Sequence, residues 1–172
     1  NFIYGGDLGW RDIGSFVKHQ GYDKVEGKLS IFNNINKNKK TDFFHPWGIY
    51  DEYLFEHIYN KLNSGKQPKF IFALTTNNHP PYVVPKHYHS QTLHLSKSLK
   101  NHLTGDLSLA KERFYSYQYA IDQVGIFLDK IKNSPLKDNT IVAITADNNT
   151  LDGIMRYDDN ILFQSKNIPF LL

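Results

Sequence analysis

Two short apolar runs constrain the fold of this chain more than any other feature. Residues 70–75 (FIFALT) and 140–146 (TIVAITA) are almost wholly apolar, and a polar segment follows each of them at once. Strands without alternating polar positions are typical of a parallel sheet that is covered on both faces. Helical patterns precede and separate the runs, as βαβ units require. The sequence therefore predicts an α/β fold with a mostly parallel sheet and helices on both faces.

The strongest helical pattern lies between the two runs. Apolar side chains recur there at spacings of three and four residues, which is typical of one helix face. They are Phe114, Tyr117, Ile121, Val124, Leu128 and Ile131. Pro135 prevents further extension of this helix, because proline lacks a backbone N–H. Shorter helices are predicted over residues 11–19 and 51–64, and Asp51 is the expected N-cap of the second.

The other segments are less regular. Residues 2–4 are predicted to form a strand. Residues 27–46 show no clear period, which predicts a loop with at most one short strand. Residues 80–107 are rich in Pro, His, Ser and Lys and are expected to form an irregular surface excursion, long enough to suggest a function.

Composition and the chain ends exclude several kinds of site and partner for this protein. The absence of cysteine excludes disulfides, cysteine-bound zinc and thiol nucleophiles. The net charge of +3 comes with scattered lysines, so we expect no nucleic-acid partner. No apolar run reaches the roughly 18 residues of a membrane span, and no signal peptide opens the chain. Asn1 stands in place of Met and residues 168–172 end on apolar side chains, so residues 1–172 are expected to be a single, partial domain.

The polar segments after the two runs are the first candidates for a site, because ligands of open α/β sheets bind at the carboxyl ends of strands. His79 lies four residues after the first run, where Pro80 and Pro81 stiffen the turn. A held imidazole can donate a hydrogen bond or shuttle a proton, but it can also simply bond the local backbone. Asp147 ends the second run and is either a metal ligand or a helix N-cap.

Further candidates are weaker. Asp7, Trp10 and Arg11 cluster after the first strand, and Arg11 could clamp a phosphate with two hydrogen bonds or could be a surface residue at a helix start. Asn148 is a poor metal ligand, because a neutral amide oxygen binds divalent ions less strongly than imidazole or carboxylate does. His87 and His89 have a metal-compatible spacing within a polar loop.

Five short motifs together resemble one family. The motifs are Tyr4-Gly5-Gly6-Asp7, Gly21-Tyr22-Asp23, Thr75-Thr76-Asn77-Asn78-His79-Pro80-Pro81-Tyr82, Tyr119-Ala120-Ile121-Asp122 and Asn139-Thr140-Ile141-Val142 leading to Ala146-Asp147. The ordered set is similar to the sulfatase-like branch of the alkaline phosphatase superfamily, and within it to the group of lipoteichoic acid synthases, phosphoglycerol transferases and phosphoethanolamine transferases.

The resemblance implies an alkaline-phosphatase-like fold and a membrane-anchored bacterial enzyme whose catalytic domain faces the periplasm or the exterior. Such an enzyme uses a divalent metal (Mn, Zn or Mg) and a Thr nucleophile to move a phosphoryl head group from a lipid to a glycan or lipid acceptor, or to hydrolyse a phosphate or sulfate ester. The metal lowers the pKa of the nucleophile and neutralises phosphoryl charge. The membrane would be reached through segments absent from this chain.

Residue by residue, the resemblance places His79 near the phosphate as a catalytic residue. Asp147 matches a metal ligand, and Asn148 stands where the family has a metal-binding His. The substrate-binding positions that it implies are Asp7, Trp10, Arg11 and Asn78.

Two departures modify this expectation. The His-to-Asn difference at Asn148 should weaken metal binding. The nucleophilic Thr and its acidic co-ligand lie upstream in the family, and no Thr here matches that role. We therefore expect the full-length parent to be the enzyme and this chain alone to be inactive. Two alternatives stay open: a catalytically impaired relative that binds a glycan or lipid head group, and an unrelated α/β binding domain.

Overall fold

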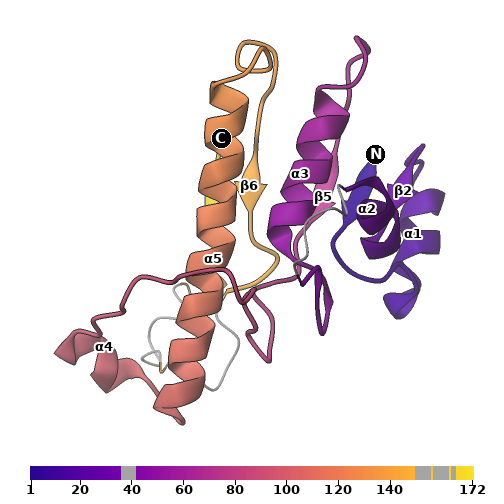
Figure 1. Ribbon diagram of the computed structural model, residues 1–172. Coiled ribbons are helices and arrows are strands. Elements are labelled where there is room, and N and C mark those ends of the chain that lie inside the picture. The colour runs from indigo at the N-terminus through magenta and orange to yellow at the C-terminus, as the bar shows by residue number, and fades with distance from the viewer. Residues whose placement is uncertain (36–41, 150–155, 157–162, 164–165) are drawn as a thin grey trace.

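A parallel sheet forms the centre of the structure, a computed structural model (Figure 1). Three strands lie in the order β2 (Val25–Glu26), β1 (Phe2–Tyr4) and β5 (Phe72–Leu74), and both outer strands run parallel to β1. The predicted α/β class with a mostly parallel sheet is confirmed. The residues that the structure describes are all except 36–41, 150–155, 157–162 and 164–165.

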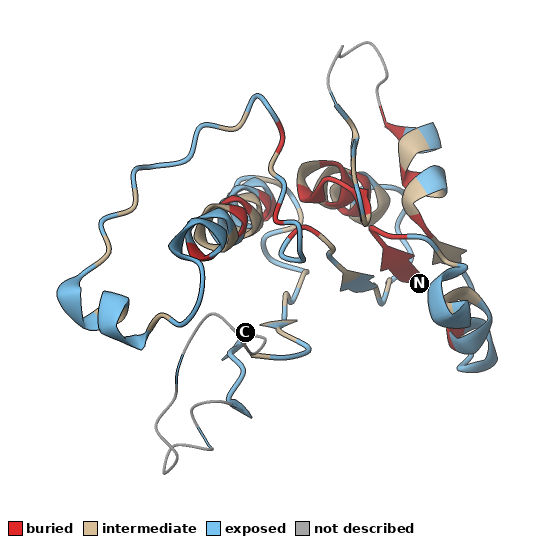
Figure 2. Cartoon of the chain, turned by 90° about the horizontal axis from the view of Figure 1, so that it is seen from below, coloured by how far each residue is buried: buried red, intermediate tan, exposed pale blue. Residues whose placement is uncertain are grey.

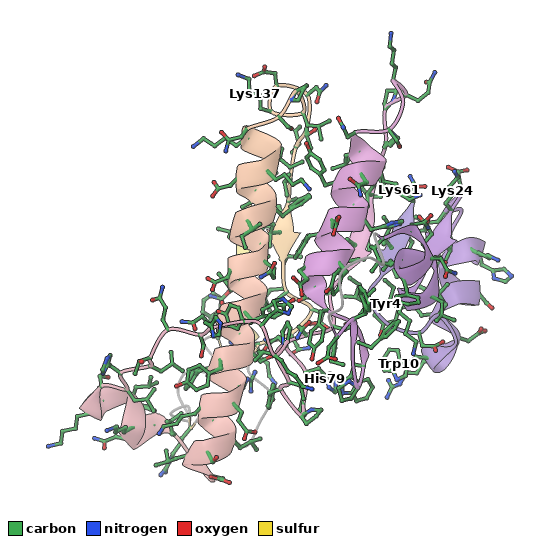
Figure 3. All side chains as sticks on the ribbon, in the orientation of Figure 1. Tyr4, Trp10, Lys24, Lys61, His79 and Lys137 are labelled. Atoms are coloured by element: carbon green, nitrogen blue, oxygen red, sulfur yellow. The ribbon has the colours of Figure 1, made fainter. Side chains whose placement is uncertain are left out.

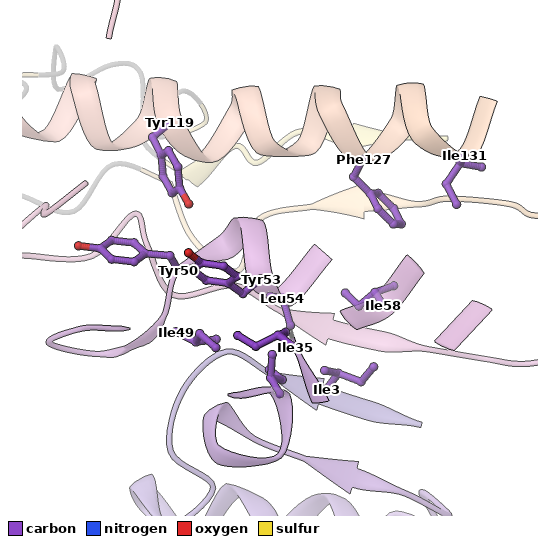
Figure 4. Packing of buried hydrophobic residues seen from close by; sticks show 11 residues of the cluster. Ile3, Ile35, Ile49, Tyr50, Tyr53, Leu54, Ile58, Tyr119, Phe127 and Ile131 are labelled. Atoms are coloured by element: carbon purple, nitrogen blue, oxygen red, sulfur yellow. The ribbon is translucent and has the colours of Figure 1, made fainter. Parts of the chain in front are cut away.

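Helices cover both faces of this sheet, as predicted. Successive side chains of a strand point to opposite faces. Ile3 is fully buried in a cluster with residues of α2 (Lys28–Asn34) and α3 (Asp51–Leu62). Phe2 and Tyr4 point the other way and pack against α1 (Ile13–His19) in a second cluster. β1 therefore separates two apolar layers, and Figure 4 shows the larger one.

The longest helix, α5 (Leu107–Lys132), packs on α3 rather than on the sheet. Phe127 stacks on Phe55 of α3 with ring centroids 5.1 Å apart, and the fully buried Tyr119 contacts Tyr50 edge-on at 6.2 Å. Figure 2 shows the buried residues of α5 on the side that faces α3. α5 begins before the predicted stripe, because Asp106 caps it by accepting a hydrogen bond from the Ser108 N–H at 2.7 Å.

The predicted apolar stripe of this helix is partly wrong. Tyr117, Ile121 and Leu128 are exposed, because the face that contacts α3 is rotated away from them. Spacing alone identified a helix, but it did not identify which of two adjacent apolar faces is covered. The buried positions of α5 are Ala110, Ser116, Tyr119, Phe127 and Ile131.

The second apolar run does not join the parallel sheet in the described part of the chain, so this prediction is wrong. Only Ile144–Thr145 of it forms a strand, β6, which pairs antiparallel with β7 (Phe170–Leu171). Ile141, in the same run, is 85% exposed. An unbroken apolar sequence fixed neither the partner nor the direction of this strand.

Residues 27–46 contain more structure than predicted. α2 occupies Lys28–Asn34, and β3 (Phe44–His45) forms an antiparallel hairpin with β4 (Gly48–Ile49). We call residues 44–49 the edge hairpin. A short 3-10 helix, η1 (Trp10–Asp12), precedes α1, and α4 (Lys97–His102) interrupts the predicted surface excursion. Among the described helices, none combines the length and apolar character that a membrane crossing needs.

Candidate active site

The edge hairpin lies across the carboxyl end of the sheet. Gly5, which follows β1, donates its N–H to the Leu74 carbonyl at 3.0 Å and accepts a hydrogen bond from the Ile49 N–H at 2.8 Å. Gly6 and Gly48 form an antiparallel bridge beside this pair. A Cβ on Gly48 would lie 2.2 Å from the Gly5 carbonyl oxygen, so only glycine permits this approach. The hairpin is thereby tied to the end of β1.

His79 lies at this edge, in the turn after β5. Its Nδ1 is 3.0 Å from the Pro80 carbonyl oxygen, and its ring centroid is 4.0 Å from that of Trp47 in the edge hairpin. The Trp47 indole N–H also donates to the Pro80 carbonyl. The local backbone bond that a plain turn histidine would make is therefore present, but a long-range aromatic contact holds the ring as well.

The edge hairpin contributes a second histidine that the sequence interpretation missed. His45 Nε2 lies 3.1 Å from the hydroxyl oxygen of Thr76. Burial lowers the pKa of His45 to about 4, with the nearby His79 acting in the same direction and a backbone hydrogen bond at Ile49 opposing it. His45 is thus a neutral imidazole at ordinary pH. The only sequence signal was its place in the turn His45-Pro46-Trp47-Gly48.

The loop after β5 rests on a buried polar pair at the start of α3. The fully buried Asp51 accepts a hydrogen bond from the Thr76 N–H at 3.3 Å, and its own N–H donates to Asn77 Oδ1 at 3.1 Å. Asp51 is therefore not the N-cap that was predicted: Tyr50 is the cap residue, and the Asp51 carboxylate holds the β5 loop instead. Burial raises the pKa of Asp51 to about 7, although hydrogen bonds from the backbone N–H groups of Thr76 and Asn77 to its carboxylate oppose the shift.

Asn77 and Asn78 differ in accessibility. Asn77 is buried, and its amide donates to the Val83 carbonyl at 3.0 Å while its own carbonyl accepts from the Ser116 hydroxyl at 2.8 Å. Asn77 thus has a structural role. Asn78, the predicted substrate contact, is exposed at the turn.

Asp7 follows the bridge of the two glycines. Its Oδ1 accepts from the Gly9 N–H at 2.9 Å, and its Oδ2 lies 3.0 Å from Lys28 Nζ. The Gly9 hydrogen bond, with a smaller contribution from Lys28, lowers the pKa of Asp7 below its ordinary value. More than half of the carboxylate side chain is exposed, so it is available to a ligand.

Trp10 and Arg11 lie next to this aspartate in η1. The Arg11 guanidinium carbon is 4.9 Å from the Trp10 ring centroid, which is a cation–π contact. Arg11 and Asp12 both adopt left-handed backbone conformations, with φ of 47° and 55°. Non-glycine residues rarely adopt this region, and such strain is commonest at binding sites. In the view of Figure 3, Tyr4, Trp10 and His79 lie below Lys24, Lys61 and Lys137.

Asp147 and Asn148 follow β6, and both are exposed. The Asn148 amide donates to Asp147 Oδ1 at 3.0 Å. Catalytic metal sites usually take three protein ligands. In the part of the chain that the structure describes, no group of three His, Asp or Glu side chains is arranged to hold a metal ion. These residues therefore do not form a complete metal site, and the roles of Asp147 and Asn148 stay predictions.

The alternating histidines of the surface excursion have another partner. His87 Nε2 lies 3.0 Å from Glu52 Oε1 at the start of α3. This ion pair, when His87 is protonated, tethers the excursion to α3. The contact gives His87 a structural role, and the described residues around His87 and His89 hold no metal cluster.

Comparisons with known proteins show the family and the fold of this chain. A family model described as Sulfatase matches residues 1–163. Lipoteichoic acid synthase 1 of Bacillus subtilis is 27% identical over 132 residues, which cover 77% of this chain and 18% of that protein. Phosphoglycerol transferase I of Salmonella arizonae is 23% identical over 172 residues, which cover 94% of this chain and 21% of that protein. The chain spans about a fifth of the length of these curated relatives.

Two solved structures share the fold. A protein of the alkaline phosphatase superfamily from Vibrio parahaemolyticus aligns with a TM-score of 0.68 and 25% identity, covering 98% of this chain and 36% of that one. The lipoteichoic acid synthase LtaP from Listeria monocytogenes aligns with a TM-score of 0.73 and 18% identity, covering 98% and 41%.

Proposed function

Because this chain belongs to the Sulfatase family, we propose that the protein containing it transfers a phosphoryl-linked head group or hydrolyses a phosphate or sulfate ester. The observation that carries the proposal is the placement of His79 at the carboxyl edge of the sheet, with its Nδ1 at the Pro80 carbonyl and its ring against Trp47. A fixed imidazole is suited to donate a hydrogen bond to an anionic oxygen or to move a proton.

The proposed substrate is a lipid-linked or glycan phosphate ester, such as a phosphoglycerol donor. The names of the relatives, lipoteichoic acid synthase and phosphoglycerol transferase, support this class. Asp7 offers an exposed, ionised carboxylate that can accept hydrogen bonds from head-group hydroxyls. Arg11 is proposed to pair with the phosphate, and Trp10 and Asn78 are proposed as further contacts of the head group.

His79 acts on the phosphoryl oxygen in this proposal. When Nδ1 is bonded to the Pro80 carbonyl, Nε2 is the ring atom available to the substrate. The protonated ring donates Nε2–H to the oxygen that gains charge, and the neutral ring takes a proton there. No Thr of this chain is proposed as the nucleophile.

A divalent metal (Mn, Zn or Mg) is part of the proposal through the family, with Asp147 and Asn148 as contributors. The described residues lack the further ligands that a complete site needs, so no step is assigned to the ion. The proposed location is the cytoplasmic membrane of a bacterium, with the domain facing the periplasm or the exterior. The membrane contact would be made by segments outside this chain.

The test is a transfer and hydrolysis assay of the full-length protein with a fluorescent phosphatidylglycerol. His79→Gln should lower kcat/KM by at least about 100-fold, because positioned acid–base groups contribute about that much or more. His19→Gln is the matched control, since His19 is an exposed histidine that bonds only the Ser15 carbonyl of its own helix among the described residues. Equal activity of the His79 variant and the wild type would refute the proposal.

A second candidate function is binding without catalysis, by a relative that holds a glycan or lipid head group. The specific observation in its favour is the pair at the end of β6, where an amide stands beside Asp147 and occupies one of its oxygens. Under this alternative the full-length protein binds the head group but turns over no ester in the same assay.

A further inference from the structure

We propose that Trp47 is a positioning residue, which fixes the orientation and the tautomer of the His79 imidazole at the carboxyl edge of the sheet. This inference rests on the proposed function, because it gives His79 the reacting role. Trp47 comes from the edge hairpin and His79 from the turn after β5, so the contact joins segments 32 positions apart (79 − 47). Trp47 is not among the residues that the sequence nominated.

The contact restricts the imidazole in two ways. The two ring centroids are 4.0 Å apart with an interplanar angle of 52°, which leaves no room for a side chain or water between them. Both rings also approach one acceptor, since the Trp47 indole N–H donates to the Pro80 carbonyl and His79 Nδ1 lies 3.0 Å from it. A ring flip of His79 would break its bond and disturb the indole.

The shared acceptor fixes the proton as well. A carbonyl oxygen only accepts hydrogen bonds, so His79 Nδ1 carries a proton whenever this bond forms. In the neutral ring, Nε2 then holds the lone pair. The arrangement therefore selects the Nδ1–H tautomer and leaves Nε2 for the substrate. The hydrogen bond that one ring nitrogen makes thus sets the protonation of the other.

Trp47 can hold another side chain because it is itself held. The edge hairpin is tied to β1 by the hydrogen bond from Ile49 to Gly5 and by the bridge between Gly6 and Gly48. His45 adds a third tie through its contact with Thr76 at 3.1 Å. A continuous path thus runs from the central strand through the hairpin to the indole and on to the imidazole.

Two measurements on the full-length protein test this role. Long-range ¹H–¹⁵N NMR of histidine-labelled protein reads the His79 tautomer, with His79→Gln as the assignment control. The wild type should show the Nδ1–H form, whereas Trp47→Ala should show a mixture of both tautomers. In the transfer assay Trp47→Ala should lower kcat by about 10- to 100-fold with KM nearly unchanged, since small misplacements of a reacting group have effects of this size.

Three further variants separate positioning from folding. Trp47→Phe keeps an aromatic ring against His79 and should recover most of the rate. Trp47→Leu fills the hairpin turn without an aromatic ring and should show the same mixed tautomers and lowered kcat as expected for Trp47→Ala. It replaces the alanine variant in the test if that variant does not fold. Phe44→Leu changes the packing of the same hairpin without touching His79 and should keep both the tautomer and the rate.

A pure Nδ1–H tautomer in Trp47→Ala or Trp47→Leu would overturn the inference, whatever the activity. Loss of the tautomer in Phe44→Leu would overturn it too, because the effect would then come from the hairpin as a whole. The tautomer is read without substrate. An active His79→Gln would therefore refute the proposed function, while the NMR result would still decide the role of Trp47.

Discussion

Polar residues at the carboxyl edge divide into two groups by burial. Asp51 and Asn77 are buried: Asn77 Oδ1 accepts from the Asp51 N–H, and the Asp51 carboxylate accepts from the Thr76 N–H, so they shape the loop after β5. His79 and Asp7 are exposed, and their contacts leave atoms for a ligand. All four residues are of types that are common in turns, so the sequence alone did not separate the buried pair from the exposed pair. Which of them are buried depends on where α3 begins.

Asp51 should make stability depend on pH. Its folded pKa of about 7 exceeds the ordinary 3.8, so the folded state holds the proton more tightly between these values. Stability from this group is therefore complete below about pH 4 and lost as pH rises through 7. Asp51→Asn imitates the neutral form, so at pH 8 it should be more stable than the wild type by on the order of 2 kcal/mol, and about equal at pH 4.

Urea unfolding of both proteins at pH 4 and pH 8 measures this difference. The comparison between variant and wild type at each pH cancels every other titrating group. A variant that is less stable than the wild type at pH 8 would contradict this expectation. It would show that the hydrogen bonds from the Thr76 and Asn77 N–H groups stabilise the ionised carboxylate more than burial destabilises it.

At the scale of elements, the sequence predicted three of the helices and the central strand, but it did not predict α2, α4 or the edge hairpin. The helix predicted over 51–64 has a strong local signal in the helical spacing of Leu54, Ile58 and Leu62, and it is present as α3. The predicted strand 2–4 is present as β1. β3 and β4 have two residues each, which is too short for a period. Their position depends on the long-range bridge between Gly6 and Gly48, which no local pattern encodes.

Gly48→Ala should damage this hairpin. The new methyl group would lie 2.2 Å from the Gly5 carbonyl oxygen and 2.9 Å from the Thr76 hydroxyl oxygen, so backbone must shift. We expect a loss of about 1–3 kcal/mol of stability, as for other overpacked sites. Gly125→Ala is the control, because its added Cβ would meet no atom within 4 Å on exposed α5. It should gain about 0.5–1 kcal/mol through helix propensity.

Thermal and urea unfolding of the two alanine variants give the comparison. Equal stability of Gly48→Ala and the wild type would mean that the hairpin tolerates separation from β1, and the path from β1 to His79 would then lose its first link.

At the scale of the whole molecule, the site draws on distant segments. The residues after β1, the edge hairpin and the turn after β5 meet at one end of the sheet. Among the described residues no hydrogen bond or ion pair connects Asp147 with His79, and the run that leads to Asp147 is outside the parallel sheet. The resemblance implied a phosphate-binding half of the site around Asp7 and His79 and a metal half at Asp147 and Asn148, and the roles of both halves remain predictions.

Asn148→His tests the metal half. If Asp147 contributes to a metal site, an imidazole in place of the neutral amide should raise the affinity of the full-length protein for Mn²⁺ or Zn²⁺ by at least about tenfold, because imidazole is the better ligand. Isothermal calorimetry of wild type and variant measures it, with Asn139→His on the surface as the control substitution. Absence of metal uptake in both proteins would favour the binding function over the enzyme.

The alternation of β1 has one more consequence. Ile3 belongs to one apolar layer, and its neighbours Phe2 and Tyr4 belong to the other. An inserted or deleted residue in this strand would exchange the layers and also shift the glycines that support the site. Insertions and deletions should therefore be tolerated in the loops of this protein far better than in these three positions, which set the register of the side chains on both faces of the sheet.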